Sequence, residues 1–194
     1  MAVYADKKVC VFCGSNVGDD LKMPAKMQQL ANYLCAHNDT LVYGGGRLGL
    51  MGKIYQDIIA QGGKVIGVIP EILKDHAVRP VGQTTLYYVS DMSARKQKMI
   101  DEADCFVVFP GGLGTMEEFF QVYSWFQLGL VQKPIILVNL DGYYDDLLKF
   151  LEHSAKTGFM PKANVEVLIV GNDFEELFEK AADFKYVKAN KWRN

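Results

Sequence analysis

Short runs of apolar residues, rich in valine and isoleucine, recur along the chain. Several of them are apolar at every position, which is typical of strands that are buried on both faces of a parallel sheet. The runs predict seven strands, at residues 9–13, 40–43, 64–69, 85–89, 105–109, 134–140 and 165–170.

Segments with apolar residues at helical spacing lie between these runs. They predict helices at residues 21–36, 50–61, 92–103, 115–129, 144–156 and 174–182. Such alternation of strand and helix is typical of a three-layer, doubly wound α/β fold of the Rossmann type with a mostly parallel sheet. Because 194 residues suffice for one well-filled core but are few for two, we expect a single Rossmann-like domain over residues 1–194.

The composition argues against several classes of partner. The net charge is −2 and the pI is near 5.9, so we expect no surface that binds nucleic acid or acidic membranes. The N-terminal stretch has no apolar segment of signal-peptide length, and no later run approaches the roughly 18 apolar residues of a spanning helix. We therefore expect a soluble, cytoplasmic protein.

The cysteines and histidines do not predict a metal site. Cys10 and Cys13 form a C-x-x-C pair, but their odd spacing on a strand points the two sulfurs to opposite faces. Neither a second such pair nor a cysteine–histidine pair at zinc spacing is present, and the three histidines are scattered. We interpret the cysteines as buried thiols.

Three loops that follow predicted strands are rich in glycine: GSN at 14–16, GGGRLGLMG at 44–52 and PGGLGTMEE at 110–118. In a doubly wound sheet such loops meet in one crevice beyond the carboxyl ends of the strands. A glycine turn that opens a helix offers free N–H groups and the positive end of the helix dipole to an anion. The loops therefore predict a site for a phosphate group.

The second of these loops allows two further interpretations. Gly44, Gly46 and Gly49 form a G-x-G-x-x-G fingerprint, and Glu71 follows the next predicted strand, as in an NAD-dependent oxidoreductase. The fingerprint lies in the second βα unit, however, and Glu71 comes late. Alternatively, the loop is a tight turn that needs glycines only for close packing.

The predicted helix at 92–103 carries Arg95, Lys96 and Lys98. A solvated helix face would explain this charge, and we expect Lys98 to lie on such a face. Arg95 lies within a turn of the helix start, near the end of the preceding strand, where a guanidinium can hold a phosphate bidentately.

Two carboxylates, Glu117 and Glu118, follow the third loop within one helical turn. Thr115 and Glu118 have the spacing of a capping box, which would explain one of them structurally. The two glutamates stand about 100° apart around a helix, so at least one is free to face the crevice. A carboxylate beside a phosphate site suits a nucleotide whose breaking N-glycosidic bond gives the ribose oxocarbenium character.

At this point PGGLGTMEE resembles the P-G-G-x-G-T-x-x-E motif of the LOG (Lonely Guy) family, the cytokinin riboside 5′-monophosphate phosphoribohydrolases once labelled lysine decarboxylases. VCVFCGSN, LVYGGGRLGLMG, IGVIP, DMSARK and NLDGYYDDLL extend the resemblance over most of the chain. It implies a cofactor-free, dimeric hydrolase without a metal that releases a base and ribose 5-phosphate from a nucleoside monophosphate.

The resemblance also assigns roles to residues. It implies that Arg95 and Glu118 are catalytic. It implies substrate binding by Ser15, Gly45, Gly46, Lys96, Gly111, Gly112, Leu113, Gly114, Thr115, Glu117 and Ser124. For a prenylated base, an apolar pocket could come from Met92, Met99, Trp125 and Phe126, which are also plausible core residues.

Two positions depart from the family pattern: Ser93 stands where a histidine is frequent, and Ala77 where members tend to have a glutamate. The second departure bears on recognition of the base or ribose and leaves the proposed catalytic pair intact. A non-catalytic carrier of molybdenum cofactor or nucleotide, with a similar fold and similar loops, is the alternative function. A lysine decarboxylase is disfavoured, because no lysine lies in a recognisable pyridoxal phosphate context.

Overall fold

The computed structural model describes residues 4–20 and 22–188, and its seven strands form one parallel sheet in the order β4-β3-β2-β1-β5-β6-β7. The strands are β1 Lys8–Phe12, β2 Thr40–Tyr43, β3 Lys64–Pro70, β4 Gln83–Val89, β5 Cys105–Val108, β6 Ile135–Val138 and β7 Ile169–Gly171. The chain winds outward from β1 to β4 and then returns to pair β5 with the other side of β1. The strand order therefore reverses between β1 and β5, where ligands bind in this class of fold.

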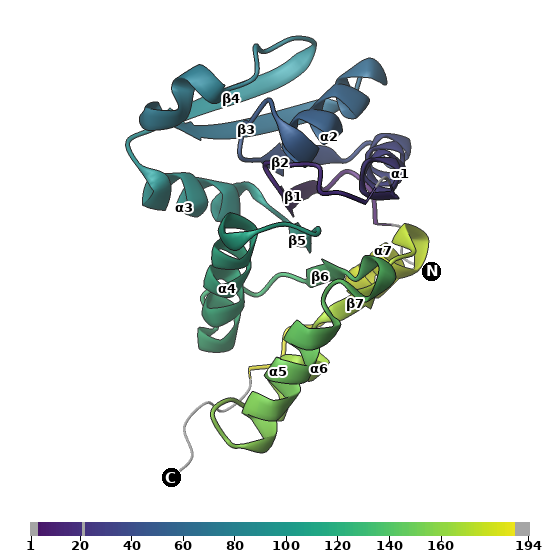
Figure 1. Cartoon of the computed structure of the whole chain (residues 1–194), viewed down its shortest axis with the longest axis vertical. Coiled ribbons are helices and arrows are strands. Elements are labelled where there is room, and N and C mark those ends of the chain that lie inside the picture. Colours follow the sequence, from purple (N-terminus) through teal and green to yellow (C-terminus); the bar gives the residue numbers. More distant parts are fainter. Residues whose placement is uncertain (1–3, 21, 189–194) are drawn as a thin grey trace.

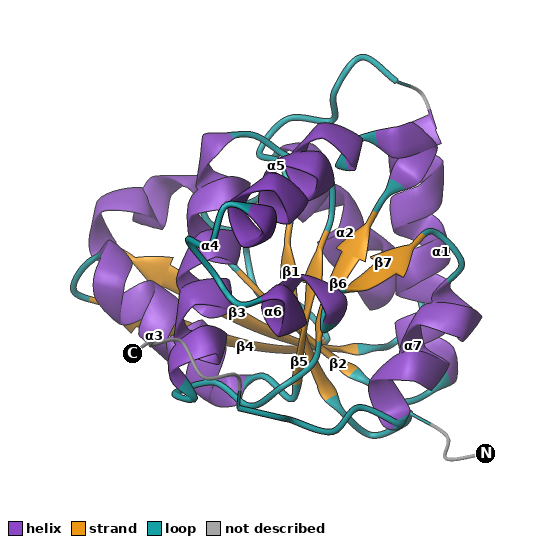
Figure 2. Ribbon diagram, turned by 90° about the horizontal axis from the view of Figure 1, so that it is seen from below, coloured by secondary structure: helices purple, strands orange, loops and turns teal. Residues whose placement is uncertain are grey.

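Helices cover both faces of the sheet and produce three layers (Figure 1, Figure 2). The α-helices are α1 Lys22–Ala36, α2 Gly49–Ala60, α3 Met92–Glu102, α4 Leu113–Leu128, α5 Asp145–Lys156, α6 Lys162–Glu166 and α7 Phe174–Ala182, with short 3₁₀ helices η1 Glu71–His76 and η2 Leu140–Gly142. The doubly wound prediction is confirmed. The predicted helix at 21–36 includes residue 21, which lies outside the described residues.

Two apolar cores lie on the two faces of the sheet, because successive strand residues point to opposite sides. In β1, Val9 and Val11 pack toward α1, α2 and α7, whereas Cys10 and Phe12 pack toward α3, α4 and α5. Cys13 belongs to the first core, so the two sulfurs of the C-x-x-C pair lie on opposite faces, as predicted. Burial raises the pKa of both thiols.

The last predicted strand is partly wrong. Residues 162–166 form α6, and strand pairing begins only at Ile169. Pro161 precedes the helix, and the buried Asn164 connects it to α4. The side-chain amide of Asn164 donates to Gln127 Oε1 at 2.6 Å, and its backbone carbonyl accepts from the Tyr123 hydroxyl at 2.7 Å. These tertiary hydrogen bonds outweigh the β propensity of the valines.

Within the described part of the chain, no helix combines the length and the apolar character that crossing a membrane requires.

Candidate functional site

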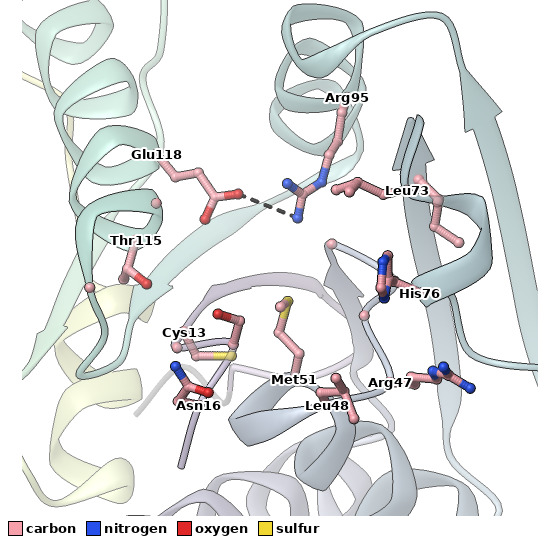
Figure 3. Close-up of a pocket in the computed structure, with 18 of the residues that line it drawn as sticks. Cys13, Asn16, Arg47, Leu48, Met51, Leu73, His76, Arg95, Thr115 and Glu118 are labelled. Atoms are coloured by element: carbon pink, nitrogen blue, oxygen red, sulfur yellow. Dashed lines mark ion pairs between the residues drawn. The ribbon is translucent and has the colours of Figure 1, made fainter. Parts of the chain in front are cut away.

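A cleft of about 520 Å³ opens beyond the carboxyl ends of β1, β2 and β5, where the three glycine-rich loops meet. Backbone from all three loops lines it, and α3 and α4 contribute side chains from above (Figure 3). The cleft lies at the reversal of strand order, as the sequence predicts.

Arg95 projects into this cleft from the first turn of α3. Asp91 caps that helix, because its carboxylate accepts the Ala94 N–H at 2.9 Å. The Arg95 side chain is only 9% exposed, yet among the residues that the structure describes its Nε–H has no hydrogen-bond partner. Its Nη1 meets the Met92 sulfur at 3.9 Å. A buried donor without a partner costs about 1–3 kcal/mol, so this guanidinium is arranged for an acceptor that a ligand would supply.

The glycine loop makes room for the guanidinium. A Cβ atom on Gly44 would lie 1.6 Å from Arg95 Nη2, so only glycine allows Arg95 to rest against the loop backbone. Gly49 has a φ of +61°, and a Cβ there would lie 2.2 Å from the carbonyl carbon of Ser15. Close packing thus explains these glycines, while Glu71, the expected ribose ligand of the NAD interpretation, lies outside the cleft lining.

Glu118 faces Arg95 from α4, and the capping-box interpretation is wrong. α4 begins at Leu113 with Gly112 as its N-cap, so Thr115 is already inside the helix, where its side chain is buried against Gly111. Glu118 Oε1 lies 3.6 Å from Arg95 Nη2 (Figure 3). This distance is too long for a hydrogen bond. The two opposite charges attract each other, but both side chains keep hydrogen-bonding capacity for a ligand.

The environment of Glu118 adjusts its acidity. Burial raises the pKa of its carboxyl to about 7, the positive charge of Arg95 opposes this rise, and Glu117 adds to it. A carboxyl group with a pKa near neutrality can accept a proton from water at physiological pH.

The N-terminus of α4 supplies further donors. No side chain in the described part of the chain caps it, and the first N–H groups of a helix have no intrahelical partner. The N–H groups of Leu113, Gly114 and Thr115 therefore stand at the positive end of the helix dipole, on the cleft wall. Together with Arg95 they form a seat for an anion.

The structure brings together ten of the thirteen residues to which the resemblance assigns a role: Arg95, Glu118, Ser15, Gly45, Gly46, Gly112, Leu113, Gly114, Thr115 and Glu117. Three lie outside the cleft lining. Lys96 forms an ion pair with Glu117 between α3 and α4. Gly111 packs under Thr115, and Ser124 is exposed about three turns along α4, where its hydroxyl donates to the Gln121 carbonyl at 2.9 Å.

Other lining residues were not singled out by the sequence. They are Asn16, Arg47, Leu48, Met51, Ile69, Leu73 and His76, whereas Ala77, the departure from the family pattern, also lines the cleft. The loops at 14–16 and 44–52 indicate some of them, but no motif indicates Leu73 or His76, because η1 was not predicted. Of the proposed apolar pocket residues only Met92 lines the cleft, while Met99 and Phe126 are buried in the core and Trp125 packs against it.

Known proteins share both the sequence and the fold. The model of the family described as "Possible lysine decarboxylase" matches residues 51–181. The chain is 39% identical over 181 residues to cytokinin riboside 5′-monophosphate phosphoribohydrolase LOG5 of Arabidopsis thaliana, covering 93% of this chain and 79% of that protein. It is 38% identical to LOG1 of the same plant, covering 92% and 84%.

A solved structure is similar at the level of the fold alone. The molybdenum cofactor binding protein of Rippkaea orientalis has a TM-score of 0.65 at 20% identity, with 91% of this chain and 96% of that chain covered. The sequence relatives are much closer than this and extend over nine-tenths of the chain. The chain therefore belongs to the LOG family, whose family model is described as possible lysine decarboxylase.

Proposed function

We propose that this protein hydrolyses the N-glycosidic bond of nucleoside 5′-monophosphates, cytokinin riboside 5′-monophosphates or AMP, to the free base and ribose 5-phosphate. One observation carries the proposal: a buried guanidinium, whose Nε–H has no partner among the described residues, lies 3.6 Å from the Glu118 carboxyl group in a glycine-lined cleft. The names of the relatives, at 38–39% identity, support the same activity.

In this reaction the bond between C1′ and the base nitrogen breaks, and its electron pair leaves with the base, which takes up a proton. The ribose becomes oxocarbenium-like, and the Glu118 carboxylate stabilises its positive charge. A water oxygen then bonds to C1′, and Glu118 accepts a proton from that water. General base assistance of this kind contributes roughly 10²- to 10⁴-fold in rate.

Arg95 and the N-terminus of α4 hold the phosphate in this scheme. A guanidinium fork and helix N–H groups both match phosphate oxygens. Lys96 acts from outside the cleft, because its ion pair with Glu117 ties α3 to α4 and keeps the two catalytic side chains facing each other. No metal and no cofactor has a role in this mechanism.

The direct test is release of free adenine from AMP, and of the free base from isopentenyladenosine monophosphate. Glu118→Gln keeps the shape of the side chain and removes its charge, so kcat should fall by about 10²-fold or more. Arg95→Ala should impair turnover as well. A folded Glu118→Gln protein that matches wild-type turnover would refute the mechanism.

The cleft also bears on the choice of base. Leu48, Met51, Ile69, Leu73 and Met92 give the cleft an apolar portion that suits a prenylated adenine. Ala77 also lines the cleft, at the position where the family members tend to have a glutamate, so this chain has no carboxylate at that place. A panel of nucleoside monophosphates ranked by kcat/KM would identify the preferred base.

We further propose that the protein is a homodimer and cytoplasmic. α4 exposes an apolar stripe on one face, with Leu113 91%, Phe120 40% and Leu128 43% exposed, and Ser124 lies on the same face. Pairing of two such stripes would bury them and place Ser124 at the interface. Sedimentation that shows a monomer at micromolar concentration would contradict the dimer.

The alternative functions receive less support. Likeness to the molybdenum cofactor binding protein at 20% identity extends to the fold alone, and a carrier has no need for a paired Arg95 and Glu118. A lysine decarboxylase is disfavoured further, because among the described residues that line the cleft none is a lysine.

A further inference from the structure

A second hollow, of about 580 Å³, lies beside the cleft and shares Arg47 and Ala77 with it. We call it the basic hollow. Its lining comprises Arg47, Gly52, Tyr55, Gln56, Lys74, Asp75, Ala77, Val78, Arg79, Pro80 and Tyr88. The Arg47 guanidinium points away from the Arg95–Glu118 pair (Figure 3), so its charge is directed out of the cleft.

Positive charge in the basic hollow is largely uncompensated. Its lining holds three cationic side chains and one carboxylate, Asp75. Among residues 4–20 and 22–188, no carboxylate lies within ion-pair distance of Arg47 or Arg79. Lys74 meets Glu71 at 3.9 Å, but both side chains are more than half exposed, so water screens this pair. A concave wall with excess positive charge attracts anions.

The backbone that carries these cations is fixed by long-range hydrogen bonds. The phenol of Tyr55, from α2, donates to the Arg79 carbonyl at 3.0 Å and accepts the Val81 N–H at 3.2 Å. The Arg47 N–H donates to the His76 carbonyl at 3.2 Å. The backbone at both arginines is therefore held in place, while their exposed side chains can turn toward a ligand in the basic hollow.

We propose that the basic hollow is a second anion site, which binds the dianion of inorganic phosphate or of a small phosphate monoester. Two guanidinium forks match the oxygens of such a group, and Lys74 adds a third positive charge. This inference does not depend on the hydrolase function, since Arg79 and Lys74 lie outside the cleft lining.

The basic hollow is joined to the cleft through the backbone. The Val78 N–H donates to the Gly45 carbonyl at 3.0 Å, so the wall of the basic hollow is bonded directly to the glycine loop that lines the cleft.

The test is calorimetric titration with inorganic phosphate at constant ionic strength, carried out on the Arg95→Ala variant so that the cleft seat is disabled. We expect one phosphate to bind. Adding Arg79→Gln should weaken this binding by about tenfold or more, because charge-assisted hydrogen bonds are lost. The matched control is Lys149→Gln, which removes a positive charge at a remote, exposed helix position.

A second arm uses ribose 5-phosphate in place of inorganic phosphate. Binding of either ligand that depends on Arg79 supports the site and identifies the source of the anion. Absence of binding by both, or equal weakening by Arg79→Gln and Lys149→Gln, would overturn the proposal. Base release from AMP by the wild type is a separate measurement, so failure of one proposal leaves the other intact.

Discussion

At the scale of single residues, the pKa of Glu118 links burial to catalysis. Burial raises this pKa to about 7, and the mechanism needs the ionised form. We expect kcat/KM to rise with pH, by about tenfold per unit on the acid side, and to level off above about pH 7. A pH–rate profile of base release measures this directly.

The second ionisation of the substrate phosphate also lies near pH 6, so the profile needs a control. Glu117 raises the pKa of Glu118, so Glu117→Gln should move the acid limb to lower pH, while the substrate ionisation stays unchanged. If the acid limb of the pH–rate profile does not move in Glu117→Gln, a group other than Glu118 controls the rate.

Gly44 is predicted to act through the position of Arg95. A Cβ at this residue would overlap the guanidinium at 1.6 Å from Nη2, and the flexible end of the arginine would move rather than the backbone. We expect Gly44→Ala to remain folded, to lower kcat by about tenfold or more, and to raise the pKa of Glu118, because Arg95 holds it down. Turnover and the acid limb of the pH profile are the measurements.

Gly63→Ala serves as the matched control for this variant. Its Cβ would lie 2.6 Å from Ile58 Cγ2 and 2.9 Å from the Cys35 sulfur, a milder side-chain overlap at a turn whose residues do not line the cleft. It should lower stability and leave kcat unchanged. Equal loss of activity in both glycine variants would show that general destabilisation, rather than Arg95, explains the effect.

At the scale of elements, the N-terminus of α4 has a glycine N-cap at the place where we propose that the phosphate binds. Its N-cap is Gly112, whose Cβ direction is open space. Gly112→Asn and Gly112→Asp both supply a capping side chain, which should raise the free energy of unfolding by roughly a few tenths of a kcal/mol over glycine. Only aspartate adds a negative charge at the proposed phosphate seat. We therefore expect a higher KM for AMP in Gly112→Asp than in Gly112→Asn, and similar values would argue against a phosphate at this helix end.

The sequence predicts most elements of this fold, because buried parallel strands leave continuous apolar runs that are hard to mistake. It fails at residues 165–168, before β7 begins at Ile169, where hydrogen bonds of Asn164 to Tyr123 and Gln127, distant in the chain, favour a helix. In the site, the spacing of Thr115 and Glu118 suits a capping box as well as it suits a Glu118 that faces the cleft. Only the actual start of α4 at Leu113 shows that Glu118 is free to face Arg95.

Residues contributed by η1 could not be predicted from the chain. Leu73 and His76 belong to no motif, and they reach the cleft because this segment is bonded to the glycine loop. Ser124 shows the opposite case, since a family motif points to it but the single chain leaves it exposed on α4. Its proposed role therefore depends on the proposed dimer, and the sequence pattern of a single chain does not show how two chains pair.

At the scale of the whole molecule, two buried carboxyl groups make stability depend on pH. Burial raises the pKa of Asp39 to about 6. Its Oδ1 accepts the Lys7 N–H at 2.8 Å, whereas the buried Oδ2 has no partner within residues 4–20 and 22–188. Burial raises the pKa of Glu118 to about 7. Both folded-state values exceed those of the unfolded chain, so the native state binds more protons between about pH 4 and 7.

The free energy of unfolding should therefore decrease as the pH rises from 4 to 7 and change little above that, as far as these two groups determine it. Asp39→Asn should remove the part of this decrease at lower pH, and Glu118→Gln should remove the part at higher pH. Because the ionised Glu118 carboxylate is a poorly solvated charge to which we assign a catalytic role, we expect Glu118→Gln to be more stable than the wild type at pH 8 while being nearly inactive. Urea unfolding at pH 5 and pH 8 measures both effects. A Glu118→Gln protein that is less stable at pH 8 would show that the ion pair with Arg95 outweighs the cost of burying the charge.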